Sequence, residues 1–473
     1  MPVNNLSEDN ILVSFSPECL EEKRYIAEVL LGEYLGWDIT FDERSDIKGI
    51  ELKLHGHRGR LMVNDDFFRT ASEKWLDEST LPNSNPRWCV DEVLTSIIGE
   101  QKIPVFYGDI NKGGSWWKLE EGVGELALDV FGTCFYFLSR YEEAVIEEAD
   151  CHGRFPSSAS TLGKWGLLDR PIVNEYLEIL WACAKQIWPN IIRKPRQFRC
   201  LPSHDIDWPF QFLDISWKIA ALNSLRAIKH GKAGSAVNWS WRYLCYRLGS
   251  LESDPYNMIR WIMEQSDERG LKSAFYYIPQ QTHPELDPED YLDHPNVMAQ
   301  WKMIIERGHE IGVHPGYETY KSSEAIKEAA ESIRNCLVDI GHSNENLGGR
   351  QHFLRWTTPD TGRHWEQAGL AYDSTLGFAD AAGFRCGTCY EYPLYDVIER
   401  KSLNLREKPL LVMDCTVVDD QYMGLGLGQE AYDTIVSLKE TCRKYCGDFT
   451  LLWHNQRFAR SEEREFYTSI LDA

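Results

Sequence analysis

The sequence has no long apolar run, and its first residues show no export pattern. None of its segments approaches the roughly 20 consecutive apolar residues that a membrane-spanning helix needs. Met1–Ser16 contains no basic stretch followed by a sustained apolar one, which is the pattern of a secretory signal peptide. We therefore expect a cytoplasmic protein without membrane insertion.

Positive charge is also scarce. The 473 residues include 50 Lys and Arg but 73 Asp and Glu, which gives a formal net charge of −23. Such an excess repels phosphate backbones and anionic lipid headgroups. Nucleic-acid binding and membrane-surface binding through a basic patch are therefore disfavoured, and a neutral or cationic substrate fits better.

Long polar or repetitive tracts are absent as well. Hydrophobic residues make up 43% of the chain and aromatic residues 12%, so we expect packed cores rather than disorder. The thirteen cysteines are an odd number and scattered, which favours reduced thiols over a disulfide framework. Cys386 and Cys389 form a single Cys-x-x-Cys pair without a second pair nearby, and we expect a structural role for it.

The length exceeds what one hydrophobic core usually organises, so we predict two domains. A basic, proline-containing stretch at residues 189–202 has the composition of a connector. We predict a smaller α/β domain at residues 1–195 and a second domain at 196–473. Periodicity in the first domain predicts helices at 19–35, 124–147 and 171–188, and short strands at 37–41, 49–54 and 103–107.

Short apolar runs alternate with amphipathic helices in the second domain. The runs lie at residues 199–203, 273–278, 310–313, 410–413 and 449–453, and the helices at 256–269, 296–307 and 323–336. Strands that alternate with helices pair in parallel and form a barrel or a barrel-like α/β domain. In such a domain the chemistry lies at the carboxyl ends of the strands.

Four of these apolar runs end in ionisable side chains: Asp205 and Asp207, His314, Asp414, and His454. Polar groups at strand exits are better explained by a functional site than by packing. Asp205 and Asp207 lie two residues apart, so in extended backbone both carboxylates project to the same side. Two such charges need a shared cation or proton, which predicts a metal ligand and a general base; an Asx-type turn before Trp208 is the alternative.

Three sequence stretches resemble motifs of the polysaccharide deacetylases, also called carbohydrate esterase family four. Ser203-His-Asp-Ile-Asp207 is similar to the first motif, Gly308-His-Glu-Ile-Gly-Val-His314 to the second, and Leu451-Leu-Trp-His454 to the last. Arg350 resembles the arginine of the third motif, and Gly369–Thr375 matches a recurrent stretch. The motifs keep the family's order and span residues 200–458.

The resemblance implies a distorted (β/α) barrel that hydrolyses the N-acetyl group of a carbohydrate. It assigns Asp205 as the base, Arg350 as the residue that orients it, and His454 as the general acid, with Asp414 as the best candidate to orient His454. Asp207 and His314 would hold a divalent metal, zinc by default.

The chain departs from the family at the third metal ligand. The family has a second histidine four residues after the first, whereas this position holds Glu318. A glutamate oxygen can bind zinc, so Glu318 is our first candidate, and His352 is the second. His204 is a further alternative, although in a strand it points away from the two aspartates. A site without tightly bound metal also stays open.

Arg140-Tyr-Glu-Glu143 and Gly153-Arg-Phe-Pro156 resemble an uncharacterised domain that precedes such deacetylase domains in bacterial proteins. This resemblance implies no activity. For the whole chain we predict an N-acyl hydrolase acting on an amino sugar or polysaccharide precursor, with Trp208 as a stacking surface for a sugar ring. Two alternatives are a metal-independent amidohydrolase of small cyclic amides or ureides, and a non-catalytic glycan-binding protein.

Overall fold

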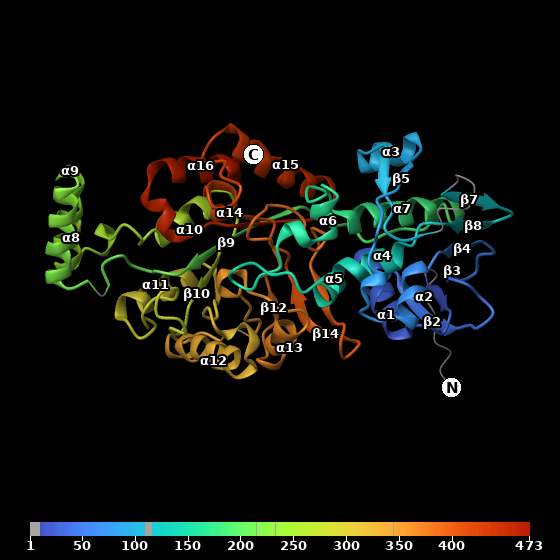
Figure 1. The fold of residues 1–473 in the computed structure, drawn as a ribbon, viewed down its shortest axis with the longest axis horizontal. Coiled ribbons are helices and arrows are strands. Elements are labelled where there is room, and N and C mark those ends of the chain that lie inside the picture. Colours follow the sequence, from blue (N-terminus) through green and yellow to red (C-terminus); the bar gives the residue numbers. More distant parts are fainter. Residues whose placement is uncertain (1–9, 109–115, 214, 232, 344) are drawn as a thin grey trace.

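The computed structural model describes residues 10–108, 116–213, 215–231, 233–343 and 345–473. These residues form a mixed α/β protein with sheets of six, five, three and two strands (Figure 1). Within the described ranges, no helix combines the length and the apolar composition needed to cross a bilayer.

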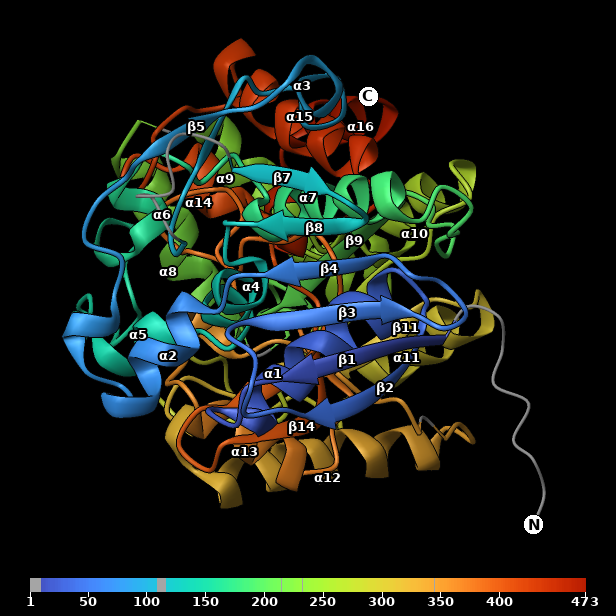
Figure 2. The same cartoon turned by 90° about the vertical axis from the view of Figure 1, so that its right-hand side faces the viewer.

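The six-stranded sheet lies in the N-terminal region. Its order is β2 (Asp38–Glu43), β1 (Asn10–Phe15), β3 (Ile50–Leu54), β4 (Arg60–Val63), β8 (Val123–Leu126) and β7 (Trp117–Glu120). Figure 2 shows the strands in front and the covering helices behind them, namely α1 (Leu20–Ala27), α4 (Val130–Leu138) and α7 (Ile172–Ile187). Ile11, Val13 and Phe15 are fully buried because alternate side chains of β1 face these helices.

The N-terminal region also contains several shorter helices and strands. They are α2 (Asp66–Glu73), β5 (Arg87–Cys89), α3 (Glu92–Ile98), β6 (Lys102–Pro104), α5 (Tyr141–Val145) and α6 (Thr161–Lys164). A π-helical segment, Glu28–Tyr34, continues α1, so the predicted helix at 19–35 exists with a change of winding.

The predicted helix at 124–147 is wrong at its start. Val123–Leu126 pairs with β4 and β7, so tertiary pairing overrides the helical pattern. The helix begins after Asp129, whose carboxylate accepts hydrogen bonds from the backbone N–H groups of Gly132 (2.7 Å) and Phe67 (2.8 Å). Arg140, in the left-handed region with φ 53°, separates α4 from α5.

The five-stranded sheet of the C-terminal region is parallel throughout. Its order is β11 (Glu310–Val313), β10 (Ala274–Tyr277), β9 (Arg199–Ile206), β16 (Asp448–Leu452) and β15 (Val412–Met413). Single bridges from Val313 to Gly349 and from Gly349 to Asp373 extend it towards β12 (Tyr372–Asp373), β14 (Lys401–Glu407) and β13 (Tyr392–Asp396). The predicted α/β class is confirmed, but no ladder among the described residues closes the sheet into a barrel.

Helices flank this sheet, and one pair of them projects from it. The flanking helices are α10 (Ile259–Glu268), α11 (Pro295–Glu306), α12 (Ser323–Asp339), α13 (Asp360–Gln367), α14 (Asp414–Val418), α15 (Gln429–Lys444) and α16 (Ser461–Asp472). The projecting hairpin, α8 (Trp217–Lys229) and α9 (Ala233–Arg247), lies between β9 and α10 in the chain (Figure 1). Our sequence predictions did not include it.

The two regions share buried contacts. Apolar residues from both sides of residue 195 belong to one continuous buried cluster. The Tyr25 hydroxyl donates to the carbonyl of Pro393 (2.7 Å), and the rings of Tyr25 and Tyr395 lie 4.7 Å apart. The boundary at 195 stays a prediction, and the region before it packs against β13 of the second region.

Candidate functional site

The predicted polar residues meet where the parallel strands end. Asp205 is the last residue but one of strand β9, and Asp207 directly follows that strand. His314 follows β11, and His454 follows β16. These four side chains line one pocket of about 230 Å³, together with His352. Parallel strands deliver their carboxyl ends to one edge, so residues up to 249 positions apart in sequence become neighbours.

Asp207, His314 and His352 form the tightest group of possible metal ligands in the pocket. One ligand atom from each lies within 4.8 Å of the other two, and all three residues are buried. Asp207 Oδ1 is 3.5 Å from His314 Nε2 and 3.7 Å from His352 Nε2. Both Asp207 Oδ1 and His314 Nε2 are buried without a hydrogen-bond partner, an arrangement that costs roughly 1–3 kcal/mol per group.

The opposite ring nitrogens of both histidines are engaged. His314 Nδ1 lies 2.6 Å from the carbonyl oxygen of Arg350, and His352 Nδ1 lies 2.7 Å from Asp287 Oδ1. A proton on each Nδ1 leaves the Nε2 lone pair free to bind a metal. Burial raises the pKa of Asp287, but the hydrogen bond with His352 outweighs it and holds this pKa well below its usual value. Two imidazole nitrogens and one carboxylate oxygen fit zinc.

Glu318, our first candidate for the third ligand, is not part of this group. Its side chain is 53% exposed and lies 3.5 Å from Arg355. A helix brings residues four apart close together on one face, but the chain after His314 runs through Pro315 and Gly316 without helical structure until Thr319. His352, our second candidate, lies with Asp207 and His314 instead.

His204 also lies outside the group, as its place in β9 led us to expect. Its Nδ1 is 2.7 Å from the carbonyl oxygen of Trp453, on the side of the strand away from the two aspartates.

Arg350 fixes the Asp205 carboxylate. Its Nη1 donates to Asp205 Oδ1 at 2.7 Å, and its Nη2 donates to the hydroxyls of Ser203 and Ser374. The other oxygen, Oδ2, lies 3.6 Å from His314 Nε2, at the edge of the metal-ligand group. One oxygen of Asp205 is therefore anchored while the other faces the pocket.

Asp414 holds His454. Its Oδ1 lies 2.7 Å from His454 Nδ1, and its Oδ2 accepts the backbone N–H of the same residue at 2.6 Å. Burial opposes a charge on the imidazole, but the carboxylate outweighs it and raises the pKa of His454 well above its usual value. His454 Nε2 lies 3.8 Å from Asp207 Oδ2, so the free nitrogen faces the ligand group.

Cys415 lies beside this pair, and Asp414, Cys415 and His454 have a spacing that metal ligands can also have. Asp414 and His454 are hydrogen-bonded to each other, however, so their facing atoms are occupied. Burial raises the pKa of the Cys415 thiol to about 11, which keeps it protonated at neutral pH. We therefore do not count this trio as the candidate metal site.

The pocket wall includes Trp208, which the sequence analysis proposed as a stacking surface, and other residues that it did not connect with the site. Trp208 stands at the pocket and is 40% exposed. Phe353 and Leu354 both have positive φ, at 60° and 54°, and this strained turn directly follows His352. Arg154 comes from the N-terminal region. It donates to the carbonyl of Phe353 (3.2 Å) and to the hydroxyl of Tyr422 (3.3 Å), a further lining residue.

Two residues that the sequence analysis did not assign to the site, Asp287 and Arg154, differ in whether a sequence motif contains them. Asp287 lies in an irregular segment, 65 positions before its partner His352, and no motif marks it. Arg154 stands in Gly153-Arg-Phe-Pro156, which we singled out but could not place near the site.

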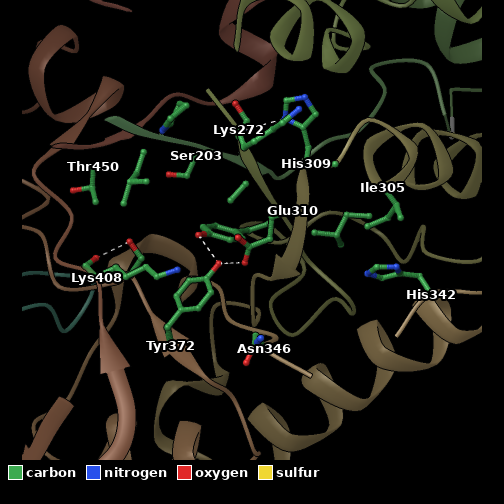
Figure 3. Close-up of a pocket in the computed structure, with 18 residues that line it drawn as sticks. Ser203, Lys272, Ile305, His309, Glu310, His342, Asn346, Tyr372, Lys408 and Thr450 are labelled. Carbon is green, nitrogen blue, oxygen red and sulfur yellow. Dashed lines mark hydrogen bonds between the residues drawn. The ribbon is translucent and has the colours of Figure 1, made fainter. Parts of the chain in front are cut away.

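A second hollow, of about 470 Å³, lies at the opposite ends of the strands. Figure 3 shows Lys272 and His309 on one side of it and Lys408 and Tyr372 on another, with the Tyr372 hydroxyl directed at Glu310. None of the predicted catalytic or metal-binding residues lines this hollow. We therefore place the candidate site at the carboxyl ends.

Residues 11–189 match the model of a family described as a family of unknown function, DUF7033. The match falls within the segment predicted as the N-terminal domain and covers less than half of the chain. No curated protein matches the sequence.

Solved structures show a distant likeness that covers 59% of this chain in each case. One is a putative polysaccharide deacetylase from Mycobacterium smegmatis, at 15% identity, a TM-score of 0.38 and 84% coverage of that chain. Another is a mutant of a CE4 family pseudoenzyme with restored enzymatic activity, at 9%, 0.29 and 63%. A third is Puue allantoinase, at 12%, 0.33 and 87%.

Proposed function

We propose that this protein is a metal-dependent hydrolase that removes an N-acetyl or related N-acyl group from an amino sugar or a polysaccharide precursor. The observation that carries the proposal is a pair of buried ligand atoms without hydrogen-bond partners, Asp207 Oδ1 and His314 Nε2, beside His352. They lie between an anchored carboxylate, Asp205, and a carboxylate-bound imidazole, His454.

Asp207, His314 and His352 are the residues that would hold the metal, with zinc as the first choice. When bound, zinc supplies a water molecule of lowered pKa and polarises the acyl carbonyl. The Arg350 carbonyl and the Asp287 carboxylate accept hydrogen bonds from Nδ1 of His314 and of His352 and so keep the two rings oriented, as the outer partners of metal ligands usually do.

Asp205 is the general base in this proposal. Arg350 holds one of its oxygens, so the other can take a proton from the attacking water without the carboxylate turning away. His454 is the general acid. Because Asp414 favours the protonated imidazole, His454 enters the reaction with a proton for the departing amine on the nitrogen that faces the pocket. Trp208 offers an aromatic face for the sugar ring.

The test is an assay of acetate release from N-acetylglucosamine and its short β-linked oligomers, with zinc-loaded protein. Asp205→Asn and His454→Ala should each lower kcat by about 100- to 10,000-fold, the usual contribution of general acid–base groups. His342→Ala, at the second hollow, is the matched control and should keep wild-type activity. If either site variant retains full activity, these roles are wrong.

A metal-independent amidohydrolase of cyclic amides or ureides is the alternative. Its motivation was the glutamate at position 318, and the place of His352 beside Asp207 favours the metal-dependent reaction instead. Activity that survives complete chelation would support the alternative. A glycan-binding protein without activity would bind acetylated sugars and release no acetate.

A further inference from the structure

The hairpin of α8 and α9 exposes an unusual amount of apolar surface. Fourteen large hydrophobic side chains are exposed in the described part of the chain, and nine of them lie on this hairpin. The nine are Trp217 (70% exposed), Ile219, Leu222, Leu225, Ile228, Val237, Trp241 (64%), Leu244 and Leu248. Single exposed hydrophobic residues are normal, whereas a cluster of this kind marks an interaction surface.

Small side chains lie in the interior of the hairpin, and Tyr243 and Tyr246 of α9 are buried against Phe212, whereas the nine side chains above stay exposed. Ala220 and Ala236 are buried between the two helices, and the hydroxyls of Ser224 and Ser240 lie 2.7 Å apart. The exposed Val237, Trp241 and Leu244 of α9, and Leu248 directly after it, recur at helical spacing and form one stripe. This apolar stripe therefore lies away from the partner helix.

The same segment reverses the charge of the chain. Residues 215–251 contain six Lys and Arg and no Asp or Glu, in a protein of net charge −23. On the described residues, no carboxylate lies within ion-pairing distance of Lys218, Arg226, Lys229 or Arg247. These four basic side chains thus stand beside exposed tryptophan and leucine without a carboxylate partner among the described residues, and Lys218 lies over the ring of Trp217 (5.7 Å).

We propose that this hairpin docks the protein on an anionic membrane surface. Helices with Lys and Arg beside exposed Trp and Leu lie in the plane of the lipid headgroups, where the apolar side chains enter the acyl boundary and the cations meet anionic lipid. Tryptophan favours that boundary because its ring is apolar and its N–H is polar. Pairing of this hairpin with the same hairpin of a second copy fits poorly, because two basic hairpins repel each other.

Docking by this hairpin would also turn the candidate site towards the membrane. The hairpin follows Asp207 and Trp208 in the chain and projects beyond the carboxyl end of β9 (Figure 1). This is the end of the sheet at which the pocket lies. The expectation against membrane-surface binding used the charge of the whole chain, and the charge of this segment has the opposite sign.

The test is co-sedimentation of the full chain with vesicles of phosphatidylcholine alone or with 40% phosphatidylglycerol. We expect at least about tenfold tighter binding to the anionic vesicles, which 1 M salt weakens because it screens the cations. The double variant Trp217→Ser, Trp241→Ser should bind at least about tenfold more weakly. The triple variant Lys218→Glu, Arg226→Glu, Lys229→Glu should lose more than about 100-fold.

The matched controls are exposed residues on other elements. Val338→Ser with Ile398→Ser, and Lys302→Glu, remove the same kinds of side chain elsewhere and should leave vesicle binding unchanged. Thermal unfolding checks that each variant is folded. Equal binding to both kinds of vesicle, no binding at all, or concentration-dependent self-association that the tryptophan variant abolishes would each overturn the proposal.

Discussion

The pocket and the junction between the two regions both bury charged side chains, but these side chains differ in whether they have hydrogen-bond partners. At the junction, Glu143 accepts hydrogen bonds from Arg140 and Arg385 at 2.8–3.0 Å, and the Arg140 guanidinium also donates to the carbonyl of Arg385. In the pocket, Asp207 Oδ1 and His314 Nε2 have no hydrogen-bond partner, although they lie 3.5 Å from each other. Buried charge with every partner present is a structural device, whereas buried lone pairs that converge without partners indicate a ligand.

Asp207→Asn should produce the largest effect in this comparison. One of three ligands carries a substantial share of a zinc-binding free energy of about 10–16 kcal/mol, so we expect zinc affinity to fall at least about 1,000-fold. The metal-free protein should lose no more than about 1–2 kcal/mol of stability, because the substituted oxygen accepts no hydrogen bond. Competition with a chromogenic chelator and urea denaturation measure the two quantities.

Glu143→Gln makes the same chemical change, carboxylate to amide, at the junction. It should lower the stability of the protein and leave its zinc affinity unchanged. It leaves two buried guanidinium groups without their shared carboxylate, which typically costs about 3–5 kcal/mol. Zinc affinity should stay within about twofold of wild type. A stable variant with impaired zinc binding would show that the junction and the pocket are not separate in function.

Acid should weaken the junction through the same residue. Burial raises the pKa of Glu143, but Arg385 and Arg140 outweigh it and lower this pKa to about 2. A carboxyl group whose pKa is lower in the folded than in the unfolded state stabilises the protein at pH values above the unfolded pKa of about 4.5. This contribution, about 3 kcal/mol, is lost as the pH falls from 4.5 towards 2. The difference in unfolding free energy between wild type and Glu143→Gln should therefore shrink between pH 6 and pH 3.

Asp287→Asn should have the smallest effect. The residue orients His352 and does not itself belong to the ligand group, and loss of such an outer partner typically lowers metal affinity by about 10–100-fold. Asp254→Asn, which also removes a buried carboxylate that accepts backbone N–H groups, is the matched control outside the pocket. Zinc affinity that is the same in both variants would remove Asp287 from the site.

The sequence predicted the elements whose signals are local. The alternation of apolar runs and amphipathic helices located the five parallel strands, and polar residues directly after them converge at one edge. The strand at 123–126 could not be predicted because its residue pattern also fits a helix. Its extended structure depends on pairing with β4 and β7, which are distant from it or folded against it only in the tertiary structure. Closure of a barrel is likewise a property of distant pairings.

The candidate site shows the same limit. Glu318 was chosen by a spacing rule that holds in helices, and the chain is not helical there. Asp287 and Arg154 reach the pocket or its ligands through long-range packing, which a single sequence does not encode in any short pattern. The net charge misled in a different way, because a total of −23 conceals the basic hairpin at 215–251.

Arg154 belongs to the region that matches a family of unknown function, yet it lines the pocket and holds the strained turn after His352. A chain that started at residue 196 would keep the proposed ligands, base and acid but would have a gap in the wall around them. The two regions therefore cannot be exchanged between proteins like independent modules. Recombination at the connector would also replace part of the wall of the candidate pocket.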